Sequence, residues 1–145
     1  MTQVFFDTSV LVAAIVAAHP MHDRAVYWLR KAKAKEIGFV VCAHTLAELY
    51  AVLTRFPVRP KISPGTVARL IRDNVEASAT IVSLSAADYR SVIKDLSERG
   101  IAGGSVYDAL IAKAARKSNA DRLLTFNPDD FERVWPNGAE IIHVP

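Results

Sequence analysis

The chain has 145 residues, of which 51% are hydrophobic and 23% charged, and its formal net charge of +3 corresponds to a pI near 9.2. This composition is that of one ordinary globular domain, residues 1–145, and it excludes a secreted disulfide scaffold because Cys42 is the only cysteine. No signal peptide is recognisable and no apolar run could span a bilayer, so we expect a cytoplasmic protein whose mild basicity permits a polyanion partner.

Strands and helices are predicted to alternate along the chain. Val4–Phe6 indicates a first buried strand, and further strands are expected at 39–42, 79–84, 122–125 and 140–144. Helices are expected at 10–16, 22–34, 45–55, 64–77, 86–99 and 105–117, with a single helical turn at 129–134. This alternation predicts a three-layer α/β/α sandwich with a mainly parallel central sheet.

The first strand leads directly into Asp7. Asp7, Thr8 and Ser9 are all good helix N-cap residues, so Asp7 could serve only to cap the next helix. Alternatively, Asp7 is a ligand at the carboxyl end of its strand, which is the edge where parallel α/β sheets bind their ligands. The second interpretation is supported because three later segments return polar or acidic residues to that edge.

Glu48 follows the second predicted strand. The sequence Thr-Leu-Ala-Glu at 45–48 matches a capping box, in which the glutamate satisfies a backbone N–H at a helix start. Helical periodicity also places Glu48 away from the apolar face that contains Leu49 and Leu53. These residues alone favour a capping role for Glu48.

Asp108 lies in the helix expected from Ser105 to about Lys117. Ser-x-x-Asp is again a capping-box pattern, but this helix is apolar almost all round and is expected to be buried. Burying a carboxylate is costly unless a cation or a hydrogen-bond donor meets it, and a metal ion would do so. A functional role is therefore favoured for Asp108.

The fourth segment follows the strand at 122–125. Asn127 lies just past the end of that strand, as Asp7 does, and Asp129 and Asp130 follow within one turn. An Asx turn before a short helix explains the same pattern, and it is the preferred role of Asp129.

Oxygen ligands that converge on one edge suit Mg²⁺ or Mn²⁺. Such an ion can activate water and stabilise charge on a phosphodiester, and it relieves the repulsion between gathered carboxylates. The histidines are not clustered with cysteines, His44 is isolated in the sequence, and no glycine-rich phosphate loop or nucleophile elbow occurs. The sequence therefore predicts a Mg²⁺ or Mn²⁺ site.

Four stretches of the sequence resemble the PIN-domain family, and more closely the VapC-type toxins of prokaryotic toxin–antitoxin pairs. They are FFDTSVLVA, TLAELYAVLTR, VYDALIAKAA and LLTFNPDDFERV, and together they span nearly the whole chain. The resemblance implies a PIN fold and a Mg²⁺- or Mn²⁺-dependent ribonuclease whose catalytic and metal-binding acids are Asp7, Glu48 and Asp108. The fourth metal position, often aspartate, is Asn127 here, which offers an oxygen but no negative charge.

Supporting roles at this site are expected for three further residues. Ser9 resembles the hydroxyl residue that often supports the first acid of the family. Asp130 could compensate for Asn127 through water, and Thr125 is a further supporting candidate.

The resemblance also implies partners, namely an RNA substrate, a cognate antitoxin protein that occupies the cleft, and a second copy of the chain in a homodimer. No membrane contact is expected. Two alternatives stay open: a nucleic-acid-binding module with weak catalysis, suggested by Asn127, and a metal-dependent nuclease that acts on DNA. Six basic residues are expected to contact RNA phosphates, although a solvated surface explains each of them equally well: Arg24, Arg30, Lys31, Arg55, Arg59 and Lys61.

Overall fold

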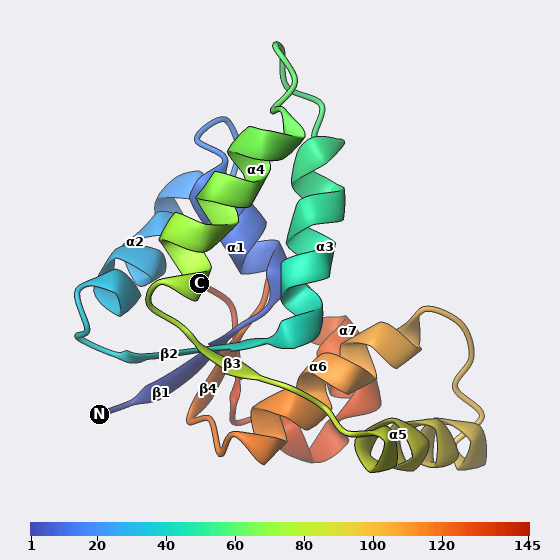
Figure 1. Cartoon of the computed structure of the whole chain (residues 1–145). Helices are drawn as coiled ribbons and strands as arrows, with labels where there is room; N and C mark the ends of the chain where they lie inside the picture. Colours follow the sequence, from blue (N-terminus) through green and yellow to red (C-terminus); the bar gives the residue numbers. More distant parts are fainter.

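The computed structural model describes residues 1–145 and contains a five-stranded sheet between two layers of helices (Figure 1). The strands are β1 (Gln3–Phe6), β2 (Gly38–Cys42), β3 (Thr80–Val82), β4 (Arg122–Leu124) and β5 (Ile142–His143). Their order is β3-β2-β1-β4-β5, and all neighbouring pairs are parallel. The predicted α/β/α sandwich is confirmed, and its sheet is wholly parallel.

The helices lie close to their expected positions. They are α1 (Thr8–Ile15), α2 (His22–Lys33), α3 (Ala43–Thr54), α4 (Pro64–Ile71), α5 (Ala86–Glu98), α6 (Ser105–Lys117) and α7 (Pro128–Val134). A π-helical stretch, Arg72–Glu76, continues α4, and a 3-10 turn, Pro136–Gly138, follows α7. None of these helices combines the length and the apolar character needed to cross a membrane.

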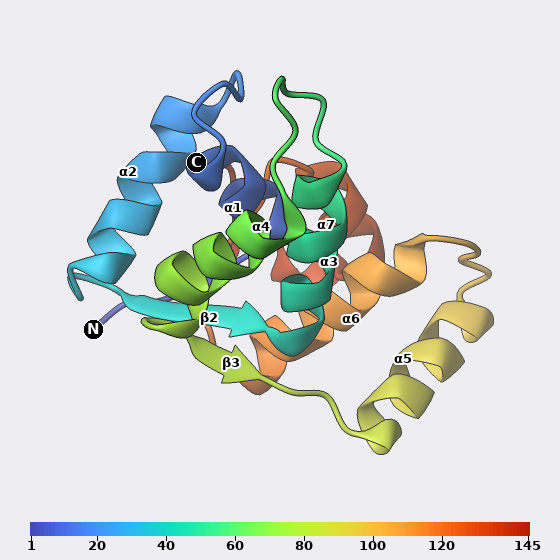
Figure 2. The same ribbon diagram turned by 45° about the horizontal axis from the view of Figure 1, so that its top comes forward.

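Side chains that alternate along the strands divide the core into two clusters. In β1, Val4 and Phe6 belong to one cluster, whereas Phe5 belongs to the other. The first cluster is closed by α1–α4 and the second by α5–α7, with α5 on the outer flank of α6 (Figure 2). Both faces of β1 are therefore buried, which explains why its sequence is a continuous apolar run.

The carboxyl ends of the strands share one edge because the strands are parallel. At this edge β1 passes into α1, β2 passes into α3, and β4 leads to α7. The first turn of α6 reaches the same place, since Asp108 and Asp7 line one cleft. The topology thus brings together segments that are far apart in the sequence.

Candidate metal and catalytic site

A cleft of about 380 Å³ lies at the carboxyl edge of the sheet. All four predicted metal ligands line it, and Val12, Met21, Val52 and Phe126 provide an apolar wall. The polar lining residues are Asp7, Thr8, Ser9, His19, Glu48, Asp108 and Asn127. The cleft therefore combines oxygen ligands with an apolar surface.

Asp7 is held at the bottom of this cleft by two hydroxyl groups. Its side chain is buried, and its Oδ2 accepts hydrogen bonds from Ser9 Oγ at 2.8 Å and from Thr125 Oγ1 at 2.9 Å. Asp7 occupies the N-cap position of α1, but its side chain makes no capping hydrogen bond. Burial raises the pKa of Asp7, whereas the two hydroxyl donors oppose that increase because they stabilise the charged form.

Backbone groups of the segment after β4 fix both hydroxyls. Phe126 N–H donates to Ser9 Oγ at 3.1 Å, and Asn127 N–H donates to Thr125 Oγ1 at 2.9 Å. Each hydroxyl accepts one backbone hydrogen bond and donates one to Asp7. The orientation of the Asp7 carboxylate is consequently linked to the conformation of residues 125–127.

Glu48 is not part of a capping box, so the capping role expected for it is wrong. Helix α3 begins at Ala43, directly after β2, which places Thr45 inside the first turn rather than at the cap. Glu48 Oε1 instead accepts a hydrogen bond from Thr8 Oγ1 at 3.2 Å and lies 3.7 Å from His44 Nε2. Burial and the charge of Asp7 raise the pKa of Glu48, while His44 and Thr8 lower it.

Asp108 also forms no capping box, because α6 begins at Ser105 and Gly104 is its cap. Ser105 Oγ accepts a hydrogen bond from Arg133 Nη1 at 3.2 Å instead. Asp108 is half-buried rather than fully enclosed, so the expectation that α6 is buried on all sides fails in its first turn. Burial and the nearby charges of Asp7, Asp130 and Glu48 raise the pKa of Asp108 to about 6.

The two candidates for the fourth ligand differ in position. Asn127 lines the cleft and is exposed, whereas Asp130 is not among the lining residues. Asp130 Oδ1 lies 3.6 Å from Arg133 Nη2 and acts on Asp108 through its charge. The geometry therefore favours Asn127 over Asp130 as the residue nearer to a bound ion.

The residues of the cleft suit a hard cation chemically. Carboxylate and amide oxygens form the donor set, and burial together with the charges of Asp7, Asp130 and Glu48 raises the pKa of Asp108, so a bound cation would relieve the repulsion between these carboxylates. No group of three or more His, Cys, Asp or Glu side chains is arranged to hold an ion as it stands.

Two contacts at this site escaped the sequence interpretation. The sequence indicates Thr8 only as a helix N-cap residue and gives His44 no neighbouring metal ligand. In the structure both side chains contact Glu48. The spacing of His44 and Glu48, four residues apart on one helix, would have indicated their contact. The contact of Thr8 crosses from α1 to α3 and has no local sequence signal.

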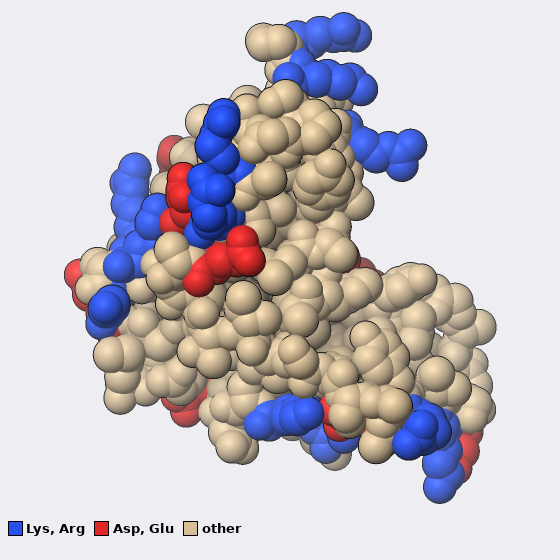
Figure 3. All heavy atoms as spheres, viewed as in Figure 1, with Lys and Arg blue, Asp and Glu red and all other residues tan.

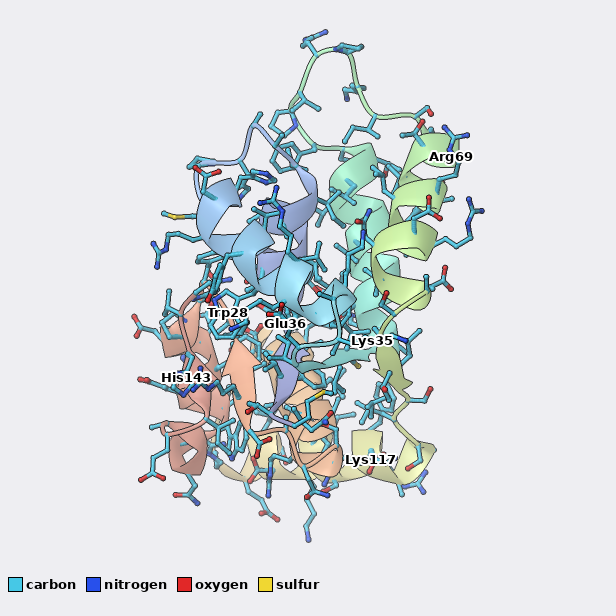
Figure 4. The ribbon with its side chains drawn as sticks, turned by 90° about the vertical axis from the view of Figure 1, so that its left-hand side faces the viewer. Trp28, Lys35, Glu36, Arg69, Lys117 and His143 are labelled. Carbon is cyan, nitrogen blue, oxygen red and sulfur yellow. The ribbon has the colours of Figure 1, made fainter.

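The basic residues of α2 are divided between the two edges of the sheet. The Arg24 guanidinium lies 5.7 Å from the ring centroid of Phe126, at the cleft. Arg30 and Lys31 lie near the other end of α2, which leads through Lys35 and Glu36 into the start of β2 (Figure 4). The expectation that Arg30 and Lys31 surround the acidic cleft is therefore wrong.

A wholly parallel α/β/α sandwich with acids gathered in a cleft at the carboxyl edge defines the class of this protein. The chain belongs to the PIN-domain family, whose sequence model matches residues 4–135. It is similar to Ribonuclease VapC40 of Mycobacterium tuberculosis, with 37% identity over 119 residues that cover 82% of each chain.

Solved structures show the same fold. The crystal structure of Mycobacterium tuberculosis VapC20, a Sarcin-Ricin loop cleaving toxin, matches with a TM-score of 0.69 at 20% identity and covers 88% of this chain and 92% of that one. VapBC2 from Rickettsia felis, bound to a DNA fragment from their promoter, matches with a TM-score of 0.66 at 22% identity over 99% of both chains.

Proposed function

We propose that this protein is a Mg²⁺- or Mn²⁺-dependent endoribonuclease, the toxin of a VapBC-type pair. The observation that carries the proposal is the convergence of Asp7, Glu48, Asp108 and Asn127 on one cleft. Family membership supports it, because a relative of 37% identity is named a ribonuclease.

The acids would hold the cation, and Ser9 and Thr125 would keep Asp7 oriented for it. A cation bound there would polarise the phosphodiester and lower the pKa of a water molecule. Glu48 is the candidate general base, since its pKa is raised and it lies at the cleft with His44 and Thr8 as neighbours. Asp108 would contribute a second carboxylate to the metal site.

The helix termini suit a phosphate substrate. Helices α1, α3 and α6 begin at the cleft, and none of their N-caps makes a side-chain hydrogen bond. By contrast, Ser63 and Ser85 cap α4 and α5, which begin elsewhere. The partial positive charge at helix N-termini stabilises anions, so these three termini favour both the carboxylates and a phosphodiester.

The test is cleavage of labelled RNA by the purified chain with Mn²⁺. We expect products that disappear with a chelator and with Asp108→Asn, and faster loss of RNA than of DNA of the same sequence. Cleavage that persists unchanged in the chelator, or in Asp108→Asn, would contradict the proposal. Preferential loss of DNA would favour the DNA-nuclease alternative, and binding without cleavage would favour a catalytically weak module.

The proposed partners are RNA, a cognate antitoxin and a second copy of the chain. An antitoxin segment in the cleft would cover the apolar wall formed by Val12, Met21 and Val52 and would present a basic side chain to the acids. The fold shared with VapBC2 is consistent with this arrangement.

A further inference from the structure

A stacked aromatic pair, His44 and Tyr107, lies beside the cleft, and the site described above gives Tyr107 no role. The rings of His44 and Tyr107 are parallel, with an interplanar angle of 2° and centroids 5.7 Å apart. His44 comes from the first turn of α3 and Tyr107 from the first turn of α6. The pair thus joins the two helices that carry Glu48 and Asp108.

The position of this pair relates it to the acids. His44 Nε2 lies 3.7 Å from Glu48 Oε1, and Tyr107 immediately precedes Asp108 in α6. The His44 ring lies parallel to the Tyr107 ring, and 54% of Tyr107 remains exposed. A flat aromatic surface therefore borders the carboxylates and is open to a second planar group.

The surroundings of the pair admit a large ligand. The molecule is hollowed between α3 and the α5–α6 region; some of the lysines and arginines in this view lie above and below the hollow, and others gather on the left of the molecule (Figure 3). The first turns of α3 and α6 approach each other on this side. A polynucleotide could therefore pass along the aromatic surface while its phosphates reach the basic rims.

We propose that the exposed face of Tyr107 stacks an unpaired RNA nucleobase next to the phosphodiester that is cut. This inference rests on the proposed ribonuclease function and adds the side chain on which a base beside the cut phosphodiester is held. Aromatic side chains stack any base, whereas bases within an A-form helix are already stacked and paired. His44 keeps the Tyr107 ring in place, which lowers the entropy lost on binding.

Another exposed tyrosine, Tyr89, lacks these features and provides a control. Tyr89 on α5 is 41% exposed, but no aromatic ring stacks on it, and it lies away from the residues that line the cleft. Tyr89→Leu removes a comparable surface ring without touching the aromatic pair. Tyr107→Leu removes the stacking ring but keeps an apolar side chain, and Tyr107→Phe keeps the ring.

The experiment uses a short single-stranded RNA with one 2-aminopurine between uridines. All proteins carry Asp7→Asn to prevent cleavage, and far-UV circular dichroism verifies their folding. We expect fluorescence quenching on binding, an affinity loss of about fivefold or more with Tyr107→Leu, and little change with Tyr107→Phe or Tyr89→Leu. An RNA that is abasic at the fluorescent position should lose similar affinity, with no further loss in Tyr107→Leu.

Equal affinity and quenching in Tyr107→Leu and the parent would overturn the inference, as would tighter binding of the matching duplex. If Tyr107→Leu does not fold, the abasic RNA decides, because unchanged affinity for it rules out stacking on Tyr107. The two proposals can fail separately. Tyr107-dependent quenching without cleavage by the wild-type chain would refute only the nuclease, and cleavage without such quenching would refute only the stacking.

Discussion

Thr125→Val is the most informative single change, because Thr125 connects Asp7 to the backbone of the segment after β4. The residue is fully buried, its hydroxyl donates to Asp7 Oδ2 at 2.9 Å, and it accepts from Asn127 N–H at 2.9 Å. Valine has nearly the same shape, so packing is preserved while both hydrogen bonds are lost. A hydrogen bond to a charged group contributes about 1.5–3 kcal/mol, and we expect the free energy of unfolding to fall by about 2 kcal/mol near neutral pH.

The sign of the pH dependence follows from which form the hydroxyl stabilises. Thr125 favours the ionised carboxylate of Asp7, so its loss raises the pKa of Asp7 further above the ordinary value. The destabilisation should therefore be largest at high pH and should shrink as Asp7 becomes protonated. Because Asp7 is less firmly oriented, metal affinity or activity should fall about 10–100-fold.

Urea denaturation at several pH values and calorimetric titration with Mn²⁺ measure both effects. Thr125→Ser is the matched control, since it keeps the hydroxyl and should retain most of the metal affinity. A Thr125→Val protein with the stability and the Mn²⁺ affinity of the wild type would refute the argument that this hydroxyl orients Asp7.

Further outcomes are expected at the same site. Asp7→Asn should abolish cleavage and weaken Mn²⁺ binding while circular dichroism still shows a folded protein, and wild-type rates in this variant would remove Asp7 from the proposed site. Asn127→Asp should tighten Mn²⁺ binding and slightly destabilise the metal-free protein, and paired calorimetric titrations and thermal melts can measure both effects. If neither the Mn²⁺ affinity nor the melting temperature changes, Asn127 lies outside the site. The pKa of Asp108 is raised to about 6, so the native state keeps this proton at pH values where the unfolded chain has already lost it. The metal-free protein should therefore lose stability as the pH rises from about 4 through 6. Asp108→Asn should flatten this part of the stability profile measured with urea. Expression of the active chain alone should arrest growth and co-expression of its antitoxin should restore it, whereas unimpaired growth at high levels of active chain would contradict a toxin.

The sequence predicted the layers well because its strands are short apolar runs and its helices carry clear end signals. Ser85 and Gly100, for example, bound α5 as expected, and Gly100 adopts the left-handed conformation with φ +67°. The capping boxes at Glu48 and Asp108 failed for a physical reason. Each helix begins earlier than its Ser or Thr suggests, so these hydroxyls lie inside the first turn and bind other side chains.

Contacts between segments were harder to predict than the segments themselves. The bonds of Thr8 to Glu48 and of Thr125 to Asp7 depend on the order of strands in the sheet, which periodicity does not specify. The placement of Arg30 and Lys31 failed similarly, since a helix that returns along a parallel sheet carries its last turn to the opposite edge. The side chains at strand ends were predictable, and the family resemblance indicated that Ser9 supports Asp7, but the other partners were not predictable.

We propose that the acids of the carboxyl edge form one metal site, and anomalous scattering from crystals grown with Mn²⁺ can locate the ion. We expect an anomalous peak within coordination distance, about 2.0–2.2 Å, of Asp7, with Asp108 or Glu48 as a further ligand. The peak should vanish in Asp7→Asn crystals grown under the same conditions. A Mn²⁺ ion that binds elsewhere, or that persists at this position in Asp7→Asn, would contradict a metal site formed by these acids.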